Sequence, residues 1–210
     1  MPQLLKIQLP KIYPITDTCI SGLSHAEQVR RLINGGAEFI QLREKRMAAG
    51  AFYEDAFSAI EIAHKSGVRV IINDRVDIAL ALKADGVHLG QDDLPTGEAR
   101  KILGPEAIIG FSTHSVEQAL AAIQLPVDYI AIGPIFATAT KENPDAVVGI
   151  DGLRAVGEAV GELPLVAIGG IGSENFRAVL DAGADSTALI SGILADPGRI
   201  TERVAKFSAV

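Results

Sequence analysis

Two segments near the end of the chain have residue types and an order that suit the binding of phosphate. Residues 167–173 read Ala-Ile-Gly-Gly-Ile-Gly-Ser, and residues 188–192 read Ala-Leu-Ile-Ser-Gly. In both, an apolar run ends in small residues just before a helical stretch, so we expect bare backbone N–H groups at a helix N-terminus, where phosphate binds. Two such segments in the last two strand-helix units indicate the phosphate site between strands seven and eight of a (β/α)8 barrel.

Three polar side chains occur at alternate positions where the second predicted strand ends. Gln41, Arg43 and Lys45 fall on one face because successive strand residues point to opposite faces. An amide, a guanidinium and an ammonium at the rim of a barrel form a donor set for a diphosphate. The alternative is a solvated run of charges in which Glu44 bridges to a neighbour.

Aspartates follow the third and the fourth predicted strands. Asp74 comes directly after Asn73, and Asp93 ends the Gly-Gln-Asp-Asp segment at residues 90–93. Carboxylates at neighbouring strand ends suit Mg²⁺, which binds a diphosphate through one or two protein carboxylates and several waters. Helix capping is the alternative for each residue, because Asp74 precedes a predicted helix and Asp93 precedes a Leu-Pro pair.

The fifth predicted strand leads into Gly-Phe-Ser-Thr-His-Ser at residues 110–115. We expect Ser112 to hydrogen-bond a ligand and Ser115 to cap the next helix. His88 and His114 are candidate acid-base groups. Neither histidine stands at a spacing that pairs it with a partner, so structural roles are favoured for both.

The longest interruption between predicted elements is the loop at residues 136–148, which carries Thr138, Thr140 and Lys141. Long loops in compact domains are often lids. Two hydroxyls and an ammonium suit closure over an anion and exclusion of water. A flexible connector is the alternative.

Three absences narrow the reaction. The sixth predicted strand contains no lysine for a Schiff base, no glutamate pair ends the fourth and seventh strands, and no interpretable Ser-His-Asp set occurs. The candidate site is therefore rich in anion donors and poor in general bases, which favours departure of a diphosphate over proton abstraction.

Apolar runs alternate with amphipathic stretches along the whole chain, in eight pairs. A doubly wound sheet also alternates in this way, but it places its ligand near the first turn, whereas polar residues here follow nearly every strand. The pattern therefore favours an α/β fold with one parallel (β/α)8 TIM barrel over residues 1–210. The predicted strands are 11–16, 37–42, 68–73, 86–89, 107–111, 128–133, 163–168 and 186–190, and the predicted helices are 24–34, 51–66, 76–83, 96–103, 115–124, 151–160, 173–182 and 196–207.

Length and composition limit the function classes. A chain of 210 residues suits one small barrel, and a formal net charge of −7 argues against a nucleic-acid partner. We expect neither a signal peptide nor a membrane span, because no apolar run is long enough for either. The lone Cys19, without a zinc motif, fits a reducing cytoplasm. Whether the chain forms a homo-oligomer stays open.

Taken together in order, the motifs of this chain resemble those of the thiamine-phosphate synthase family over nearly the whole length. Each motif alone is weak, but their order and spacing are specific. They are Tyr-Pro-Ile-Thr-Asp at 13–17, Gln-Leu-Arg-Glu-Lys at 41–45, Asn-Asp-Arg at 73–75, Gly-Val-His-Leu-Gly-Gln-Asp-Asp at 86–93, Gly-Phe-Ser-Thr-His-Ser at 110–115, Gly-Pro-Ile-Phe at 133–136, Thr-Ala-Thr-Lys at 138–141 and Ala-Ile-Gly-Gly-Ile at 167–171.

The resemblance implies a barrel transferase that joins a hydroxymethylpyrimidine diphosphate to a thiazole phosphate and releases pyrophosphate, by a dissociative mechanism with Mg²⁺. It implies that Asp74 and Asp93 ligate the metal and that Arg43, Ser112 and Lys141 are catalytic. The residues implied to hold the pyrimidine diphosphate are Gln41, Arg43, Lys45, Asn73, Ser112 and Lys141. Those implied to hold the thiazole phosphate are Thr138, Thr140, Gly169, Gly170, Ile190 and Ser191.

Two alternatives accompany this interpretation. A thiazole tautomerase shares the barrel and several motifs but moves protons on the thiazole, and His114 keeps this alternative open because that branch uses a histidine in this region. Retention of Lys45, Asp74, Asp93 and the Thr-Ala-Thr-Lys segment favours the synthase. A non-catalytic phosphate-binding barrel is the second alternative. Ala137 departs from the proline that many relatives carry, which would loosen the loop without removing a ligand.

Overall fold

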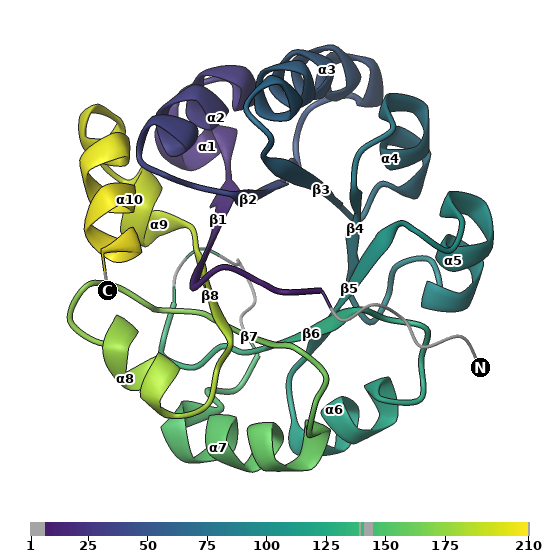
Figure 1. The fold of residues 1–210 in the computed structure, drawn as a ribbon, viewed down its shortest axis with the longest axis vertical. Coiled ribbons are helices and arrows are strands. Elements are labelled where there is room, and N and C mark those ends of the chain that lie inside the picture. Colours follow the sequence, from purple (N-terminus) through teal and green to yellow (C-terminus); the bar gives the residue numbers. More distant parts are fainter. Residues whose placement is uncertain (1–6, 139, 141–144, 210) are drawn as a thin grey trace.

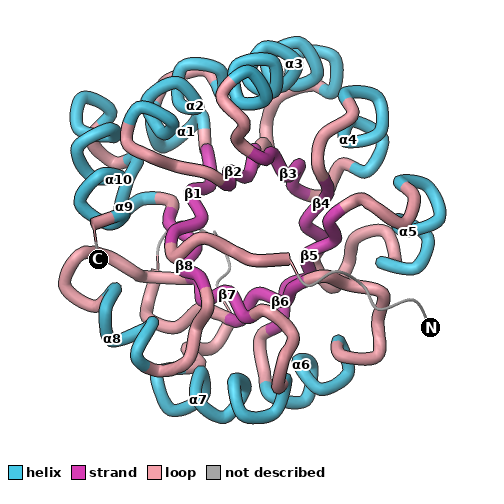
Figure 2. Tube along the Cα trace, viewed as in Figure 1, coloured by secondary structure: helices cyan, strands magenta, loops and turns pink. Residues whose placement is uncertain are grey.

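Eight parallel strands close into a barrel in the computed structural model, which describes residues 7–138, 140 and 145–209. Each strand pairs with the next in the chain, and β8 returns to β1 with Ile12 opposite Thr187. Helices surround the ring of strands (Figures 1 and 2). The predicted (β/α)8 barrel is confirmed, and the doubly wound alternative is wrong because the sheet has no edges.

The strands lie where the apolar runs predicted them, within a few residues at each end. The largest difference is in β5, predicted to end at residue 111, which continues to Thr113. Ser112 and Thr113 pair with Ala131 and Ile132 of β6, and the Thr113 hydroxyl donates to the Ala131 carbonyl at 3.0 Å. The strands are β1 (Ile12–Thr16), β2 (Phe39–Leu42), β3 (Arg69–Asn73), β4 (Gly86–Leu89), β5 (Ile108–Thr113), β6 (Tyr129–Ile132), β7 (Leu165–Ile168) and β8 (Ser186–Leu189).

The helices differ from prediction mainly in the last quarter of the chain and after β1. The predicted helix 173–182 is the shorter α8, and the predicted helix 196–207 is divided into a 3-10 turn and α10. The short helices α1 and α9 were not predicted. The helices are α1 (Thr18–Ser21), α2 (His25–Asn34), α3 (Ala49–Lys65), α4 (Val76–Leu82), α5 (Thr96–Leu103), α6 (Val116–Ala122), α7 (Gly149–Val160), α8 (Phe176–Asp181), α9 (Ser191–Leu194), η1 (Pro197–Arg199) and α10 (Ile200–Ser208). No helix in the described part of the chain is both long enough and apolar enough to cross a bilayer.

Alternation along the strands separates two apolar layers. One set of side chains packs outward against the helices, and the other fills the space inside the ring, the lumen. Ile7 and Leu9 also pack on the lumen residues, and the segment that carries them crosses the opening of the ring in Figure 2. The lumen residues are Tyr13, Ile15, Phe39, Ile71, Tyr129, Ala131, Val166 and Ala188.

A repeated aspartate ties strands together at the amino-terminal end of the barrel. Asp85, Asp128 and Asp185 each precede an even-numbered strand. Each carboxylate accepts a hydrogen bond, at 2.7–2.9 Å, from a backbone amide in the strand before it, the donors being Val70, Ile109 and Leu165. Catalytic residues of such barrels gather at the opposite, carboxyl-terminal rim, so this end serves stability.

Candidate functional site

Two aspartates meet at the carboxyl-terminal rim where β3 and β4 end. Asp74 has a positive φ of 61°, and its amide donates to the His88 carbonyl at 2.9 Å, which turns the chain beside β4. The carboxyl groups of Asp74 and Asp93 lie close enough to interact directly. Desolvation raises the pKa of Asp93, and the neighbouring Asp74 adds to this effect. Two carboxyl groups in contact indicate a place for a cation.

The donor set at this point fits Mg²⁺. Lys45 from the β2 loop pairs with Asp74, and the Gly90 amide donates to Asp93 at 2.7 Å. Among the described residues, no third histidine, cysteine or acid joins the two aspartates. Mg²⁺ keeps several waters and takes few protein ligands when it binds with a diphosphate, so two carboxylates suffice.

Neither aspartate caps a helix in the structure. The N-cap residues of α4 and α5 are Arg75 and Pro95, and neither helix has a side-chain cap. The capping alternative is therefore wrong for Asp74 and for Asp93. Ser115, by contrast, caps α6 as predicted, by accepting from the Gln118 amide at 3.2 Å.

The cationic side chains after β2 point to different neighbours along the rim. Arg43 pairs with Asp17 at the end of β1, while Lys45 reaches Asp74 at the end of β3. Asp17 is held in turn as the N-cap of α1. The predicted alternation ends with the strand at Leu42, so of the three polar residues only Gln41 points into the lumen. Arg43 and Lys45 lie beyond the strand and point toward the neighbouring strands on opposite sides.

Glu44 organises the loop that carries these cations. Its carboxylate accepts from the Thr18 hydroxyl at 2.7 Å and from the amides of the three residues that follow it. Partial burial opposes ionisation, but these hydrogen bonds outweigh it and lower the pKa of Glu44 to about 2. Glu44 also lies 3.5 Å from the ring of the buried His25. It therefore folds its own loop and pairs with no lysine or arginine that the structure describes.

A chain of side-chain hydrogen bonds crosses the lumen between two predicted ligand-binding residues. We call it the lumen chain; in order it consists of Gln41, Tyr13, Tyr129, His88 and Ser112. The four successive distances are 2.9, 2.9, 3.0 and 2.9 Å. The rings of His88 and Tyr129 also stack, with centroids 5.5 Å apart. Burial lowers the pKa of His88 to about 4, so its ring is neutral at pH 7.

Asn73 presents an unused donor at the end of β3. The residue is buried, and within the described ranges its Nδ2 has no hydrogen-bond partner. A buried amide without a partner carries a desolvation cost that a ligand acceptor would remove. This geometry suits the predicted role of Asn73 in ligand binding.

The glycines after β7 make room for the segment that follows β6. Gly169 and Gly170 have φ values of +102° and +64°, and a Cβ at Gly169 would lie 2.5 Å from the Cβ of Pro134. The Phe136 amide donates to the Gly169 carbonyl at 3.0 Å. The two glycines therefore dock the loop beside the place where phosphate was predicted.

Only one of the two predicted phosphate segments begins a helix directly. Ser191 starts α9, and no side chain caps this helix, so its first amides lie at an uncapped N-terminus next to Ile190. The other segment is followed by a turn, in which Asn175 accepts from the Gly172 amide and donates to the Gly170 carbonyl. The prediction of a helix N-terminus at residue 173 is wrong, because this turn delays α8.

The loop between β6 and α7 is described in part. Thr138 accepts from the Thr140 amide at 3.3 Å. Lys141, predicted to be catalytic, lies outside the described residues. His114 bonds the Gly133 carbonyl at 2.6 Å through Nδ1, which also lies 3.5 Å from Asp145, so this histidine contacts both ends of the loop.

Sequence reasoning missed three residues that support the site. Tyr13 and Tyr129 were expected only as strand residues, although their inward positions in β1 and β6 were readable from alternation. Asp17 belongs to the motif at 13–17, but no role was predicted for it. It comes directly after a strand, as Asp74 does, and this position could have indicated that it lies on the rim.

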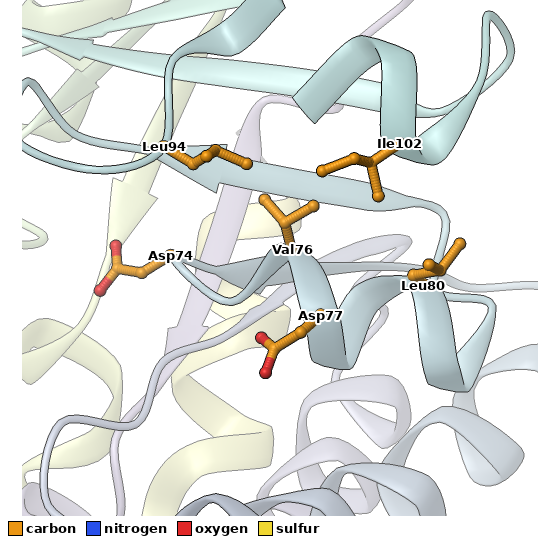
Figure 3. A pocket seen from close by; sticks show the side chains of 6 residues that line it. All are labelled: Asp74, Val76, Asp77, Leu80, Leu94 and Ile102. Atoms are coloured by element: carbon orange, nitrogen blue, oxygen red, sulfur yellow. The ribbon is translucent and has the colours of Figure 1, made fainter. Parts of the chain in front are cut away.

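A pocket of about 410 Å³ lies outside the barrel, between α4 and α5. Figure 3 shows that Val76, Leu80, Leu94 and Ile102 line it and that the Asp74 carboxylate points away from them. No cation lines this pocket, so it does not suit a phosphate. The rim, and not this pocket, is the candidate site.

Fold and site together define a (β/α)8 barrel of the class that binds phosphorylated small molecules, with contacting carboxylates, two cations and an uncapped helix on one rim. A family model described as thiamine monophosphate synthase matches residues 12–193. The chain belongs to this family.

Individual relatives agree with the family match. The chain is 44% identical over 186 residues to the thiamine-phosphate synthase of Chloroflexus aurantiacus, which covers 88% of this chain and 85% of that protein. It is 46% identical over 198 residues to that of Koribacter versatilis, covering 91% and 92%. A solved thiamine phosphate pyrophosphorylase from Pyrococcus furiosus is 38% identical, with a TM-score of 0.84 over 95% of each chain.

Proposed function

We propose that this chain is a transferase that joins a hydroxymethylpyrimidine diphosphate to the nitrogen of a thiazole phosphate and releases pyrophosphate. The family and its named relatives support this reaction. The observation that carries it in the structure is the pair of contacting carboxylates, Asp74 and Asp93, beside Lys45 on the rim. A site of this kind suits an anion that arrives with a cation.

In this proposal Asp74 and Asp93 hold Mg²⁺, which supplies positive charge to the departing diphosphate when it is bound. Arg43 and Lys45 bind the diphosphate oxygens. Both cations pair with carboxylates in the structure, with Asp17 and Asp74 respectively, so each is held in place at the rim before a ligand arrives. Preorganised donors of this kind stabilise charge that develops as a leaving group departs.

The reaction proceeds by departure of the diphosphate before attack by the thiazole nitrogen. The described part of the rim supports diphosphate departure over proton abstraction, because His88 is neutral with a pKa of about 4 and His114 is engaged by a backbone carbonyl. Neither histidine is placed as a general base. Thr138 and Thr140 on the loop, with the backbone at Gly169, Gly170, Ile190 and Ser191, bind the thiazole phosphate. Lys141 on the same loop binds the pyrimidine diphosphate, and the closed loop excludes water.

Pyrophosphate release tests this function directly. We expect release only when the pyrimidine diphosphate, the thiazole phosphate and Mg²⁺ are all present. Conversion of the thiazole phosphate alone would indicate the tautomerase instead. Binding of either substrate without any product would indicate a non-catalytic barrel. The comparisons favour neither of these alternatives.

Two further expectations accompany the proposal. A cytoplasmic location and the absence of a nucleic-acid or membrane partner remain predictions.

Lys141→Ala should lower kcat on the order of 10², as the loss of one preorganised donor does. Pre-steady-state measurement of pyrophosphate release checks this value, and an unchanged kcat would assign Lys141 to a simple connector.

A further inference from the structure

We propose that the lumen chain is a one-way chain of hydrogen bonds that fixes the Ser112 hydroxyl as a donor toward the ligand. The inference deepens the proposed function, because it assigns Tyr13, Tyr129 and His88 as positioning residues for Ser112. It starts from a constraint on protons: each hydroxyl in the chain carries one, and a neutral imidazole also carries one.

The direction is set at the Gln41 end. The Gln41 atom that bonds the Tyr13 hydroxyl is Nε2, which has protons to donate and accepts none. Tyr13 therefore accepts from Gln41, and its own proton is left for its other partner, the Tyr129 hydroxyl at 2.9 Å. Burial raises the pKa of both tyrosines, so both hydroxyls keep their protons.

The direction then passes through His88. Tyr129 already accepts from Tyr13, so it donates to Nδ1 of His88 at 3.0 Å. A ring whose Nδ1 accepts a hydrogen bond carries no proton there, so its proton lies on Nε2. Nε2 donates to the Ser112 hydroxyl oxygen at 2.9 Å, and the Ser112 proton remains free for a group at the rim.

The barrel is built to leave room for this chain. Gly110 faces the lumen from β5, and a Cβ there would lie 2.1 Å from Cζ of Tyr129 and 2.5 Å from Nδ1 of His88. Any larger residue at this position would therefore displace the contact between Tyr129 and His88.

The consequence for the ligand is a fixed polarity at both ends of the lumen chain. Ser112 meets an acceptor, such as a diphosphate oxygen or a ring nitrogen. Gln41 donates from Nε2 to the Tyr13 hydroxyl in the lumen, so its Oε1 can accept from a ligand donor such as an amino group. A pyrimidine diphosphate with an exocyclic amino group carries both kinds of group.

The tautomer of His88 in the unmodified protein tests the direction without any assay of activity. In ¹⁵N-labelled protein, two-bond couplings between ring protons and nitrogens distinguish the two neutral tautomers, and loss of signals in His88→Gln identifies the residue. We expect the Nε2–H form at pH 7. The Nδ1–H form, or a charged ring, would overturn the proposal. Because no substrate is used, this result stands even if the proposed reaction fails.

Kinetics test whether the chain acts through Ser112. Tyr129→Phe should lower kcat/KM for the pyrimidine diphosphate about tenfold, the effect of one misdirected hydrogen bond, and leave KM for the thiazole phosphate within about twofold. In a Ser112→Ala background the same change should alter kcat/KM less than about twofold, since the residue it directs is gone. An equal factor in both backgrounds would mean that Tyr129 serves only the fold.

A matched control separates this effect from loss of stability. Tyr53 lies on α3, outside the lumen chain, and Tyr53→Phe removes the same hydroxyl. We expect it to leave both kinetic parameters unchanged. Thermal unfolding of each variant confirms that the assayed protein is folded.

Discussion

At the scale of single residues, the carboxylates on the rim are arranged at a cost to the fold. The contact between Asp74 and Asp93, together with desolvation, raises the pKa of Asp93, which means that ionised Asp93 is disfavoured in the folded protein. Active sites commonly hold such perturbed groups because the ligand or metal supplies the missing charge. At position 93, therefore, the residue that suits the site is not the residue that would make the folded protein most stable.

Replacement of one rim carboxylate should weaken the response to Mg²⁺. We expect Asp93→Asn to raise the Mg²⁺ concentration for half-maximal activity more than about tenfold, because one ligand loses its charge. A titration of pyrophosphate release against Mg²⁺ measures this. Asp92→Asn removes the same charge from the exposed neighbour and should leave the titration unchanged. Equal behaviour of the two variants would exclude Asp93 as a ligand.

The same carboxylate predicts a pH dependence of stability without Mg²⁺. Because the pKa of Asp93 is higher in the folded state than in the unfolded chain, its ionisation costs stability as pH rises through the interval between these values. Asp93→Asn should therefore be more stable than the unmodified protein at pH 7, and the difference should shrink as pH falls through that interval. Urea unfolding at a series of pH values checks this, and a difference that does not vary with pH would contradict it.

At the scale of elements, two neighbouring glycines join the loop after β6 to the turn after β7. Gly169 and Gly170 were expected only as a place for phosphate, yet their positive φ values and their close approach to Pro134 and Phe136 show a second constraint. The same backbone thus holds the loop and faces the predicted phosphate site.

A side chain at this position should disturb both features. We expect Gly169→Ala to lower the free energy of unfolding by about 2 kcal/mol or more, from the strained φ and the clash with Pro134, and to raise KM for the thiazole phosphate. Gly157→Ala is the matched control in α7, where the added Cβ meets nothing nearer than 3.7 Å. That variant should gain about 0.5–1 kcal/mol from helix propensity. Urea unfolding and substrate titrations check both expectations.

Element types were readable from the sequence because barrel strands are short apolar runs and the helices between them are amphipathic. Three of the differences from prediction share one cause, which is hydrogen bonding between a side chain and the backbone. Asn175 shortens the predicted helix 173–182, Asp17 starts the unexpected α1, and the Thr113 hydroxyl extends β5. Such bonds depend on the final geometry and leave little trace in periodicity.

The candidate site, like the fold, could be predicted in part from the sequence. Residues directly after strands, such as Asp74 and Asp93, follow from the rule that the carboxyl-terminal rim carries function. The ion-pair partners of these residues could not be predicted from the sequence. Only the fold shows that Arg43 pairs with Asp17 and Lys45 with Asp74. The lumen chain was missed because Tyr13 and Tyr129, which connect Gln41 to His88, each resemble an ordinary core residue.

At the scale of the whole molecule, the two ends of the barrel do different work. Asp128 at the amino-terminal end accepts from the Ile109 amide and pairs with Arg100 at 2.7 Å, with both side chains largely buried. Its counterparts Asp85 and Asp185 repeat the bond to the preceding strand. None of these contacts reaches the rim.

Removal of such a bond should lower stability and leave chemistry intact. We expect Asp128→Ala to cost about 2 kcal/mol, the range for a lost hydrogen bond to a charged group, with unchanged kcat per folded molecule. Asp151→Ala removes a fully solvated partner of Arg154 and should change stability by less than about 0.5 kcal/mol. Urea unfolding with active-site titration separates the two quantities. A fall in kcat of correctly folded Asp128→Ala would show that the ends are coupled.

The segment that carries Ile7 and Leu9 crosses the opening of the ring and packs on the lumen residues, so it closes the amino-terminal end of the barrel interior. A ligand bound on the opposite rim would close the other end. The hydroxyl protons beneath would then be isolated from solvent on both sides, and their exchange with water should slow when substrate binds and quicken when product leaves.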